Sequence, residues 1–275
     1  MNLFKDYTNI IVQYEELYKS EFIYNKPFIL TVNWNNTKYE FFINLKPNAS
    51  NLLVFGSGAY NPQKMKPPVF QRHSWIDHFE DSTIFYNDPT LYLGPMNLGW
   101  GHGTTDKFYL EDIADIIQIV MDKISIKSQQ VLFYGSSGGG FMSLALGGFI
   151  KGAKVLVNNP QTVVSNYYES HVNRLFKFSH PQLSKGEILK KFPERLNILE
   201  LYKKLNHVPD IYYLQNIACG HDMKNHVTPF ISGLKSLNET TNFKQVHFDF
   251  YFDKELDHNP VDLEKTLYYI YKVKP

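Results

Sequence analysis

The sequence predicts an α/β fold with a mostly parallel central sheet and helices on both faces. Three observations support this fold class. Short apolar segments alternate with longer helical segments along most of the chain, the order that connects parallel strands through crossover helices. Several short segments are apolar at every position, as strands buried on both faces are. The length of 275 residues suits one large domain, spanning residues 1–275, with an insertion.

The N-terminal part departs from this alternation. Apolar residues within the range 10–18 recur at roughly helical spacing, which predicts a short helix. Residues 27–34 and 38–44 have the composition of two strands, and Asn35-Asn36 between them is a typical turn sequence. We therefore expect an N-terminal antiparallel hairpin, which makes the sheet mixed.

Strands and helices alternate from residue 51 onward. The predicted strands occupy residues 51–55, 83–86, 130–134, 153–157, 210–214 and 245–252, and the predicted helices occupy residues 109–124, 138–150 and 263–271. The helix at 138–150 is apolar at almost every position, so we expect it to be buried all round. The stretch from about 166 to 209 lies between two strands and exceeds the length of one crossover, so we interpret it as a helical cap insertion.

The predicted cap carries a surplus of positive charge. Residues 171–210 contain eight Lys or Arg and four Asp or Glu. A solvated helix surface explains such a surplus, and a surface that faces an anion is the alternative. The whole chain has 28 Lys and Arg against 27 Asp and Glu, so its overall charge does not point to nucleic acid as a partner.

Cysteine content and hydropathy indicate the cellular compartment in which the protein is expected. Cys219 is the single cysteine, which excludes an internal disulfide and fits a reducing environment. Residues 1–20 mix charged and apolar side chains and lack the basic start and apolar core of a signal peptide. No run of about 18 apolar residues occurs, so we expect no membrane span. These features predict a cytoplasmic protein, or at most one peripheral to a membrane, and leave its oligomeric state open.

The strongest chemical signal is the segment Gly135-Ser136-Ser137-Gly138-Gly139, which has the form G-x-S-x-G. It follows an apolar strand and precedes an apolar helix, the context of a nucleophile elbow. An elbow strains the central serine, and side chains two positions before or after it would collide with backbone. We therefore predict Ser137 as the nucleophile and the Gly138 N–H as an oxyanion donor. A glycine-rich helix start or a phosphate loop is the alternative, although the lysine of a Walker A loop is absent.

Chain order selects the partners of the serine, because in this architecture an acid and then a histidine follow the nucleophile. His258 lies on the loop between the last predicted strand and the last helix, so we predict it as the general base; an exposed loop histidine is the alternative. Asp222 follows the strand at 210–214 and is predicted to orient His258, with a helix N-cap as the alternative role. His221 and His226 flank Asp222 but form a weak metal signal, and we expect no metal.

Two further loops are candidates for the site. The loop after the strand at 51–55 is predicted to supply a second oxyanion donor from Ala59, with Gly58 as the close alternative. Residues 98–104 place three glycines around Trp100 and His102. A flat aromatic beside flexible backbone suits sugar stacking or a substrate wall, so both residues are candidates for substrate binding. A loop anchored by a buried tryptophan is the alternative.

Together these features resemble the α/β-hydrolase superfamily, from the strand at residue 51 to the C-terminus. Four segments are also similar to a motif series of the bacterial capsular polysaccharide O-acetyltransferases built on this fold: the elbow at 135–139, Val157-Asn158-Asn159-Pro160-Gln161, Cys219-Gly220-His221-Asp222 with His226, and Asp257-His258-Asn259. The resemblance implies a catalytic triad of Ser137, Asp222 and His258, with the serine acetylated from acetyl-coenzyme A. It assigns no function to the Asn-Pro-Gln segment.

The resemblance also implies an activity. We expect a serine acyl-transfer enzyme, an O-acetyltransferase that modifies a bacterial surface or capsular polysaccharide through an acetyl-serine intermediate. Its partners would be acetyl-CoA and a glycan acceptor. An esterase or deacetylase, in which water attacks the same acyl-enzyme, is one alternative. A catalytically inactive scaffold in polysaccharide assembly is another.

Overall fold

The structure is a computed structural model that describes residues 4–238 and 241–275. Its main sheet contains the strands β1 (Asn9–Gln13), β2 (Phe28–Trp34), β3 (Thr37–Asn44), β4 (Leu52–Phe55), β5 (Ser82–Tyr86), β6 (Val131–Ser136), β7 (Lys154–Pro160), β9 (Asp210–Asn216) and β11 (Val246–Tyr251). The helices are α1 (Tyr109–Lys123), α2 (Ser137–Phe149), α3 (Glu169–Ser179), α4 (Lys185–Lys191), α5 (Pro193–Leu196), α6 (Ile198–Leu205), α7 (Gly220–Asp222), α8 (Thr228–Asn238) and α9 (Leu263–Val273). Two short strands, β8 (His207–Val208) and β10 (Asn242–Phe243), pair separately.

The strand order of the main sheet is β1-β2-β3-β5-β4-β6-β7-β9-β11 within the described residues. β3 is antiparallel to both β2 and β5. The other neighbouring pairs are parallel, so in the described part of the chain β3 alone runs against the rest of the sheet. A mostly parallel sheet with an antiparallel hairpin is the predicted fold, and the structure confirms it.

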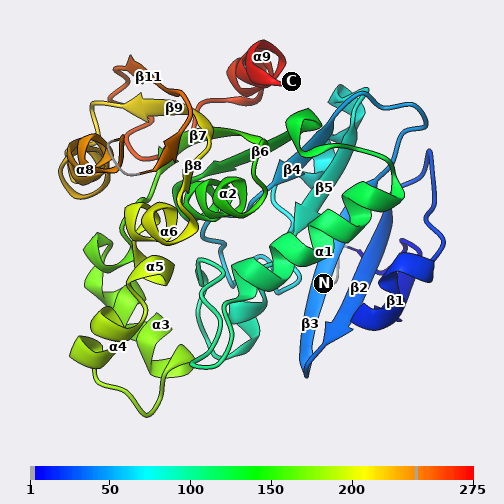
Figure 1. The fold of residues 1–275 in the computed structure, drawn as a ribbon, viewed down its shortest axis with the longest axis horizontal. Helices are drawn as coiled ribbons and strands as arrows, with labels where there is room; N and C mark the ends of the chain where they lie inside the picture. The colour runs from blue at the N-terminus through cyan, green and yellow to red at the C-terminus, as the bar shows by residue number, and fades with distance from the viewer. Residues whose placement is uncertain (1–3, 239–240) are drawn as a thin grey trace.

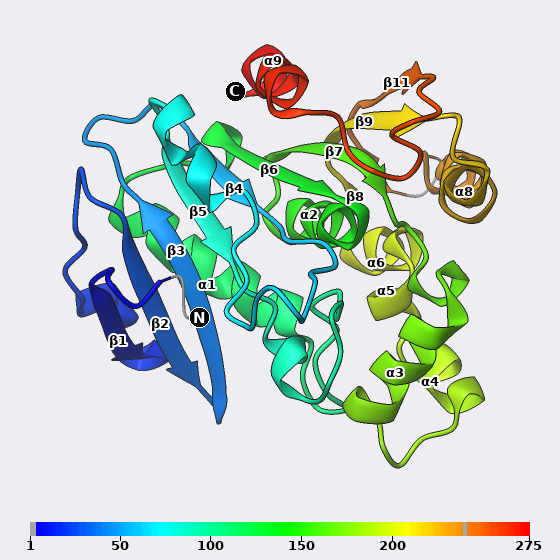
Figure 2. The same ribbon diagram turned by 180° about the vertical axis from the view of Figure 1, so that it is seen from behind.

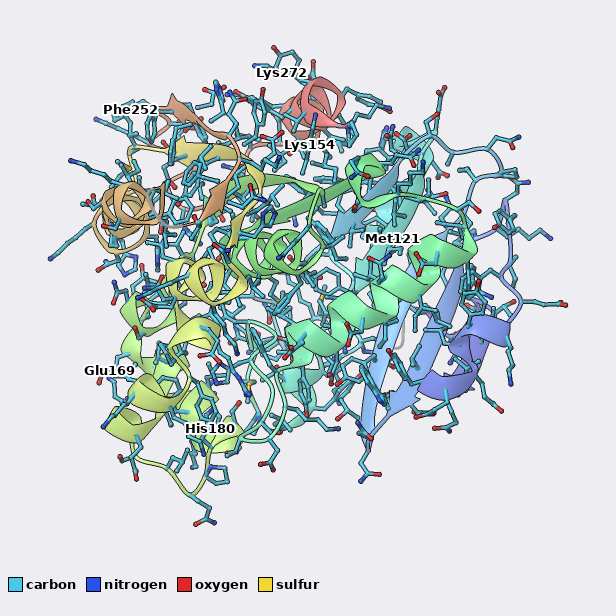
Figure 3. All side chains as sticks on the ribbon, viewed as in Figure 1. Met121, Lys154, Glu169, His180, Phe252 and Lys272 are labelled. Atoms are coloured by element: carbon cyan, nitrogen blue, oxygen red, sulfur yellow. The ribbon has the colours of Figure 1, made fainter. Side chains whose placement is uncertain are left out.

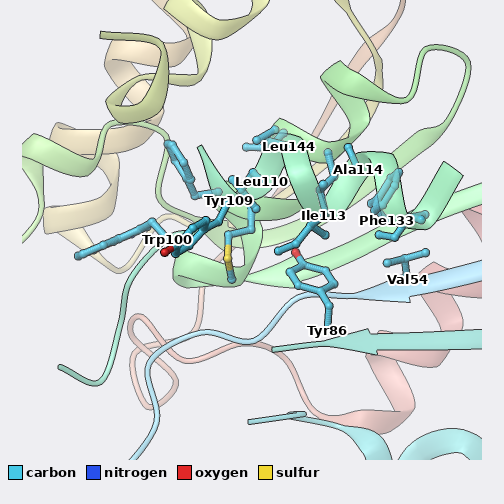
Figure 4. Close-up of a cluster of buried hydrophobic side chains, with 14 of the residues drawn as sticks. Val54, Tyr86, Trp100, Tyr109, Leu110, Ile113, Ala114, Phe133 and Leu144 are labelled. Atoms are coloured by element: carbon cyan, nitrogen blue, oxygen red, sulfur yellow. The ribbon is translucent and has the colours of Figure 1, made fainter. Parts of the chain in front are cut away.

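Side chains alternate along the strands and divide the core into two layers. On one face Val54, Phe133 and Val155 belong to a cluster that also contains the apolar sides of α1, α2, α6 and α8. On the other face Leu53 and Phe55 pack in a second cluster with α9. α1 crosses in front of the sheet in Figure 1 and lies behind β3 and β5 in Figure 2. Figure 4 shows side chains of α1 and α2 meeting those of the strands in the first cluster.

The N-terminal segment differs from its prediction. Residues Asn9–Gln13 form strand β1, which pairs in parallel with β2, and the helical part is a short 3-10 helix at Tyr14–Lys19. Ile10 and Val12 are half-buried while their neighbours are exposed, the two-residue period of an edge strand. The predicted helix at 10–18 is therefore wrong, because the open edge of β2 offered backbone hydrogen bonds to the first half of that stretch.

The stretch from 166 to 209 contains α3, α4, α5 and α6. α6 is tied to α2, since the Tyr202 hydroxyl donates to the Leu144 carbonyl at 3.0 Å. Arg195 donates to the Thr104 carbonyl at 2.6 Å and so fastens α5 to the glycine-rich loop. Figure 3 labels Glu169 and His180 at the two ends of α3. Among all the helices of residues 4–238 and 241–275, none is both long and apolar enough to cross a membrane.

Candidate active site

Ser137 lies at the turn from β6 into α2, at the carboxyl edge of the parallel strands. Its backbone φ is 54°, in the left-handed region that residues with a side chain rarely adopt, and such strain costs about 1–3 kcal/mol. The N–H groups of the first turn of a helix have no intrahelical acceptor, so α2 presents the Gly138 N–H beside the serine. This is the strained conformation that the elbow motif predicts.

The flanking glycines allow the backbones around the elbow to touch. A Cβ atom on Gly135 would lie 2.2 Å from the Gly139 carbonyl oxygen, and one on Gly139 would lie 2.6 Å from the Gly56 carbonyl oxygen. Real Cβ atoms do not approach backbone so closely. Glycine is therefore required at both positions for β6, α2 and the loop after β4 to meet.

Ser137, His258 and Asp222 are joined by two hydrogen bonds. The Nε2 atom of His258 lies 2.8 Å from Ser137 Oγ, and its Nδ1 atom lies 2.6 Å from Asp222 Oδ2. The Asp222 side chain is 1% exposed and that of His258 is 31% exposed. When Nδ1–H donates to the carboxylate, Nε2 is an acceptor for the serine hydroxyl. The arrangement has the geometry for transferring the hydroxyl proton to the imidazole and back.

Buried asparagines hold the loop that carries His258. Asn159 Nδ2 donates to the carbonyls of His258 at 3.1 Å and Asn259 at 2.9 Å. Asn158 Oδ1 accepts from the Val261 N–H at 2.8 Å. Both asparagines lie at the end of β7 and are completely buried. The segment that carries the Asn-Pro-Gln motif therefore holds the loop with His258 in place through these hydrogen bonds.

Asp222 ends the short helix α7, and burial disfavours the charged forms of two nearby side chains, His226 and Cys219. Burial lowers the pKa of His226 to about 4, against the opposing effect of Asp222. Burial raises the pKa of the Cys219 thiol to about 12; the backbone N–H of Asp222 opposes this effect, and the Asp222 carboxylate adds to it. Cys219 is therefore a protonated thiol rather than a rival nucleophile.

Two groups of side chains near Asp222 could hold a metal. His221, Asp222 and His226 form one, and Cys219, Asp222 and His258 form the other, with their ligand atoms within 4.8 Å of one another. Both groups include Asp222. A cation bound at either group would occupy the carboxylate that contacts His258 Nδ1, and the expectation of no metal stays a prediction.

The loop after β4 is braced by Gln71. Its Oε1 atom accepts from the Gly58 N–H at 2.9 Å, and its Nε2 atom donates to the Ala59 carbonyl at 2.9 Å. The bond to Gly58 occupies the N–H that was the alternative oxyanion donor. Within the described residues the Ala59 N–H has no hydrogen-bond acceptor in the protein. This difference favours the Ala59 N–H over the Gly58 N–H as the second oxyanion donor. Nothing in the sequence indicated that Gln71 braces this loop.

Trp100 and His102, the candidates for substrate binding, are both completely buried. His102 Nε2 lies 2.7 Å from His180 Nε2. The indole N–H of Trp100 donates to the side-chain oxygen of Gln161. The two side chains therefore face protein rather than solvent, which favours the alternative interpretation of a loop anchored by a buried tryptophan.

Gln161 is a residue of the site that the sequence did not single out for chemistry. Its Nε2 atom lies 3.1 Å from Ser137 Oγ. The available signal was its place in the motif segment 157–161, which the resemblance to the O-acetyltransferases includes without a role.

The sheet order and the elbow define the α/β-hydrolase fold, and comparison with solved structures agrees. No protein-family model matches the chain, and no curated protein sequence matches it. The capsule O-acetyltransferase of Neisseria meningitidis serogroup A is similar in structure: a mutant in complex with CoA matches with a TM-score of 0.66 and 13% identity, over 90% of this chain and 95% of that chain. The structural likeness thus extends to the enzyme class that the motifs resemble.

Two peptidase structures share the fold. Dipeptidyl peptidase 4 of Porphyromonas gingivalis matches with a TM-score of 0.61 and 11% identity, over 91% of this chain and 36% of that chain. Prolyl oligopeptidase B of Galerina marginata matches with a TM-score of 0.58 and 12% identity, over 88% of this chain and 35% of that chain. Because one fold hosts many reactions, these likenesses define the architecture and leave the activity to the site.

Proposed function

We propose that this protein is a serine-dependent acyltransferase that moves an acetyl group from acetyl-CoA to a hydroxyl of a bacterial surface or capsular polysaccharide. The observation that carries the proposal is the continuous hydrogen-bond chain from Ser137 Oγ through the His258 imidazole to the buried Asp222 carboxylate. A serine becomes a useful nucleophile when a base accepts its proton and a third group orients that base. Each of the three roles, nucleophile, base and orienting acid, has a named residue here.

The reaction has two balanced halves. His258 Nε2 takes the Ser137 proton while Oγ attacks the thioester carbonyl, and the C–S bond breaks as the imidazolium returns that proton to the thiolate of CoA. A sugar hydroxyl then gives its proton to Nε2 and attacks the acetyl-serine, and Ser137 leaves with the proton from His258. The N–H groups of Gly138 and Ala59 would bind the oxyanion in both halves.

Surface charge suggests where an anionic substrate would lie. The cap segment 166–209 places exposed Arg174 and Lys177 on α3, and both line a hollow of about 500 Å³ with Asn173. Positive side chains here suit the phosphates of CoA or an anionic polymer. An enzyme that uses acetyl-CoA would work in the cytoplasm, where that thioester is made.

A second candidate is an esterase or deacetylase. The observation that favours it is the exposure of the His258 side chain, at 31%, which lets water reach the base beside the acyl-serine. Transferase and hydrolase then differ in whether the acceptor or water attacks first.

The test supplies purified protein with acetyl-CoA, with and without capsular polysaccharides, and follows both thiol release and acetyl ester on the polymer. Ser137→Ala is the control. We expect thiol release that depends on the polymer and on Ser137, together with an acetylated Ser137 peptide. Thiol release or nitrophenyl acetate cleavage at a rate that does not change when the polymer is added would support the hydrolase. Full acetyl transfer by Ser137→Ala would overturn both candidates.

A further inference from the structure

The segment that the resemblance left without a role ends beside the nucleophile. Gln161 follows β7 and is completely buried. Its side-chain Nε2 lies 3.1 Å from Ser137 Oγ, and its backbone N–H donates to the Ser137 carbonyl at 3.1 Å. The serine hydroxyl proton is directed at His258, so the contact with Gln161 uses a lone pair of the same oxygen.

The orientation of the Gln161 amide follows from its second partner. The Trp100 indole N–H faces the other end of the amide. An indole nitrogen can only donate a hydrogen bond, so the amide atom facing Trp100 must be the oxygen. The NH₂ group must then face Ser137. The amide is therefore locked as a donor to the nucleophile.

The glycine-rich loop holds Trp100 in this place. Trp100 has a φ of 53°, and Gly101 donates its N–H to the buried Asp88 carboxylate at 2.9 Å. A Cβ atom on Gly99 would lie 2.6 Å from the same carboxylate. The indole belongs to the buried core cluster and makes an edge-to-face contact with the Tyr167 ring, with 5.8 Å between the ring centroids. Loop 98–104 thus presents one N–H group to one amide oxygen.

A glycine on α2 lets Gln161 reach the serine. A Cβ atom on Gly140 would lie 2.6 Å from Pro160 Cβ. The absence of a side chain at Gly140 therefore allows the end of β7 to approach the first turn of α2, where Ser137 pairs with Pro160. Two motifs that look unrelated in the sequence, the glycine-rich loop and the Asn-Pro-Gln segment, thus meet at the Gln161 amide, which contacts the Ser137 hydroxyl.

We infer that Gln161 is a catalytic residue of the proposed acyl transfer and that Trp100 is its positioning residue. The inference rests on the proposed function, because it concerns the charge that Ser137 Oγ gains during the reaction. Gln161 Nε2–H donates to Oγ as the proton moves to His258, and again as Oγ leaves the acetyl carbon. A hydrogen bond to a negatively charged oxygen is stronger than one to a hydroxyl or an ester oxygen, so the donor stabilises both transition states more than the resting states.

The test measures how fast a fluorophosphonate probe modifies Ser137, because this reaction depends on Oγ and needs neither acetyl-CoA nor a glycan. Gln161→Glu keeps the shape and the acceptor for the Trp100 N–H but replaces the donor facing Ser137 with a carboxylate oxygen. We expect labelling to slow by about 10²-fold, the usual effect of losing one such donor. Gln118→Glu, on the exposed side of α1, adds the same charge elsewhere and should label at the wild-type rate.

A double-mutant cycle separates positioning from simple packing. Trp100→Phe keeps an aromatic ring and removes the N–H, so the amide of Gln161 is free to turn, and we expect labelling to slow by about tenfold. A glutamate at 161 presents an oxygen in either orientation. Trp100→Phe should therefore cause no further slowing of labelling in the Gln161→Glu background. If the double variant instead slows by the product of the two single-variant factors, Trp100 acts only through packing, and this result would overturn its positioning role.

The outcomes distinguish this inference from the proposed function. If the wild type labels at Ser137 and Gln161→Glu labels within about twofold of it, Gln161 is not catalytic and the nucleophile assignment stands. If folded wild-type protein does not label at all, the nucleophile assignment fails and the role of Gln161 fails with it. Circular dichroism and the melting temperature establish that each variant is folded. If Gln161→Glu does not fold, the labelling rate of Trp100→Phe becomes the test. A folded Trp100→Phe variant that labels at the wild-type rate would then overturn the inference.

Discussion

The imidazole Nδ1 of His258 lies 2.6 Å from Oδ2 of Asp222, a carboxylate that is 1% exposed. A buried carboxylate against one ring nitrogen determines which tautomer the imidazole adopts, and it leaves the other nitrogen free to accept the Ser137 proton. This contact joins the end of α7 to the loop before α9, and the two residues are 36 positions apart in the chain.

Asp222→Asn is expected to lower kcat by about 10⁴-fold, because an amide can donate to Nδ1 and so favour the wrong tautomer. The KM for the acyl donor should change little, since the side chain does not face substrate. Asp77→Asn, an exposed residue before β5, is the matched control. Steady-state kinetics with acetyl-CoA or a nitrophenyl ester measures both values, and an Asp222→Asn enzyme with wild-type kcat would remove Asp222 from the mechanism.

Gly135→Ala is expected to destabilise the fold, by about 1–3 kcal/mol or more, because its Cβ would overlap the Gly139 carbonyl at 2.2 Å. Gly186→Ala on α4 has nothing within 4 Å of the new Cβ and should instead stabilise by about 0.5–1 kcal/mol through the unfolded state. Urea unfolding gives both free energies. Equal effects of the two substitutions would contradict the close packing of the elbow.

Gln71→Ala is expected to reduce kcat by up to about 10²-fold with a smaller change in KM. The substitution removes the side-chain hydrogen bonds that brace Gly58 and Ala59, and an oxyanion donor displaced by about 1 Å loses much of its effect. Gln63→Ala, an exposed glutamine in the same loop region, serves as the comparison. A selective rise in KM would place Gln71 in substrate binding and argue against its role in bracing the loop after β4.

Acidification is expected to destabilise the protein through His180. Burial lowers the pKa of His180 to about 4 from the usual 6.5, and Arg195 and Lys191 add to the effect. The unfolded chain therefore binds more protons between those values, so this contribution to stability is complete above about pH 6.5 and falls as the pH drops toward 4. His180→Gln, which keeps a polar partner for His102, should flatten the decline in melting temperature between about pH 7 and pH 5. An unchanged slope would mean that other groups set the pH dependence.

Arg174→Ala combined with Lys177→Ala is expected to raise the KM for the anionic substrate several-fold and leave kcat nearly unchanged, because the two charges lie on α3 outside the reacting groups. The rise in KM should shrink at high salt, where the attraction is screened. Lys154→Ala and Lys272→Ala, at the opposite end of the molecule in Figure 3, provide the matched loss of two charges. The same KM for both double variants would exclude α3 as a binding surface.

The parallel strands and the elbow could be predicted because their causes are local. Residues 131–134 form a continuous apolar strand, and the glycines beside Ser137 permit one particular turn. The N-terminal helix could not be predicted correctly, because β1 exists only where the free edge of β2 lies beside it. Burial of Trp100 was one of two interpretations left open, since a loop sequence does not say which side faces the core.

Sequence alone therefore determined the α/β fold, the position of Ser137, and the chain order in which Asp222 and His258 follow it, because these depend on residue type and short-range pattern. Tertiary structure alone decided that Gln161, fixed by Trp100, lies 3.1 Å from Ser137 Oγ. Gln161 and Trp100 are 61 positions apart. A hydrogen bond between such residues arises from the packing of β7, α2 and the glycine-rich loop, and no local pattern encodes it.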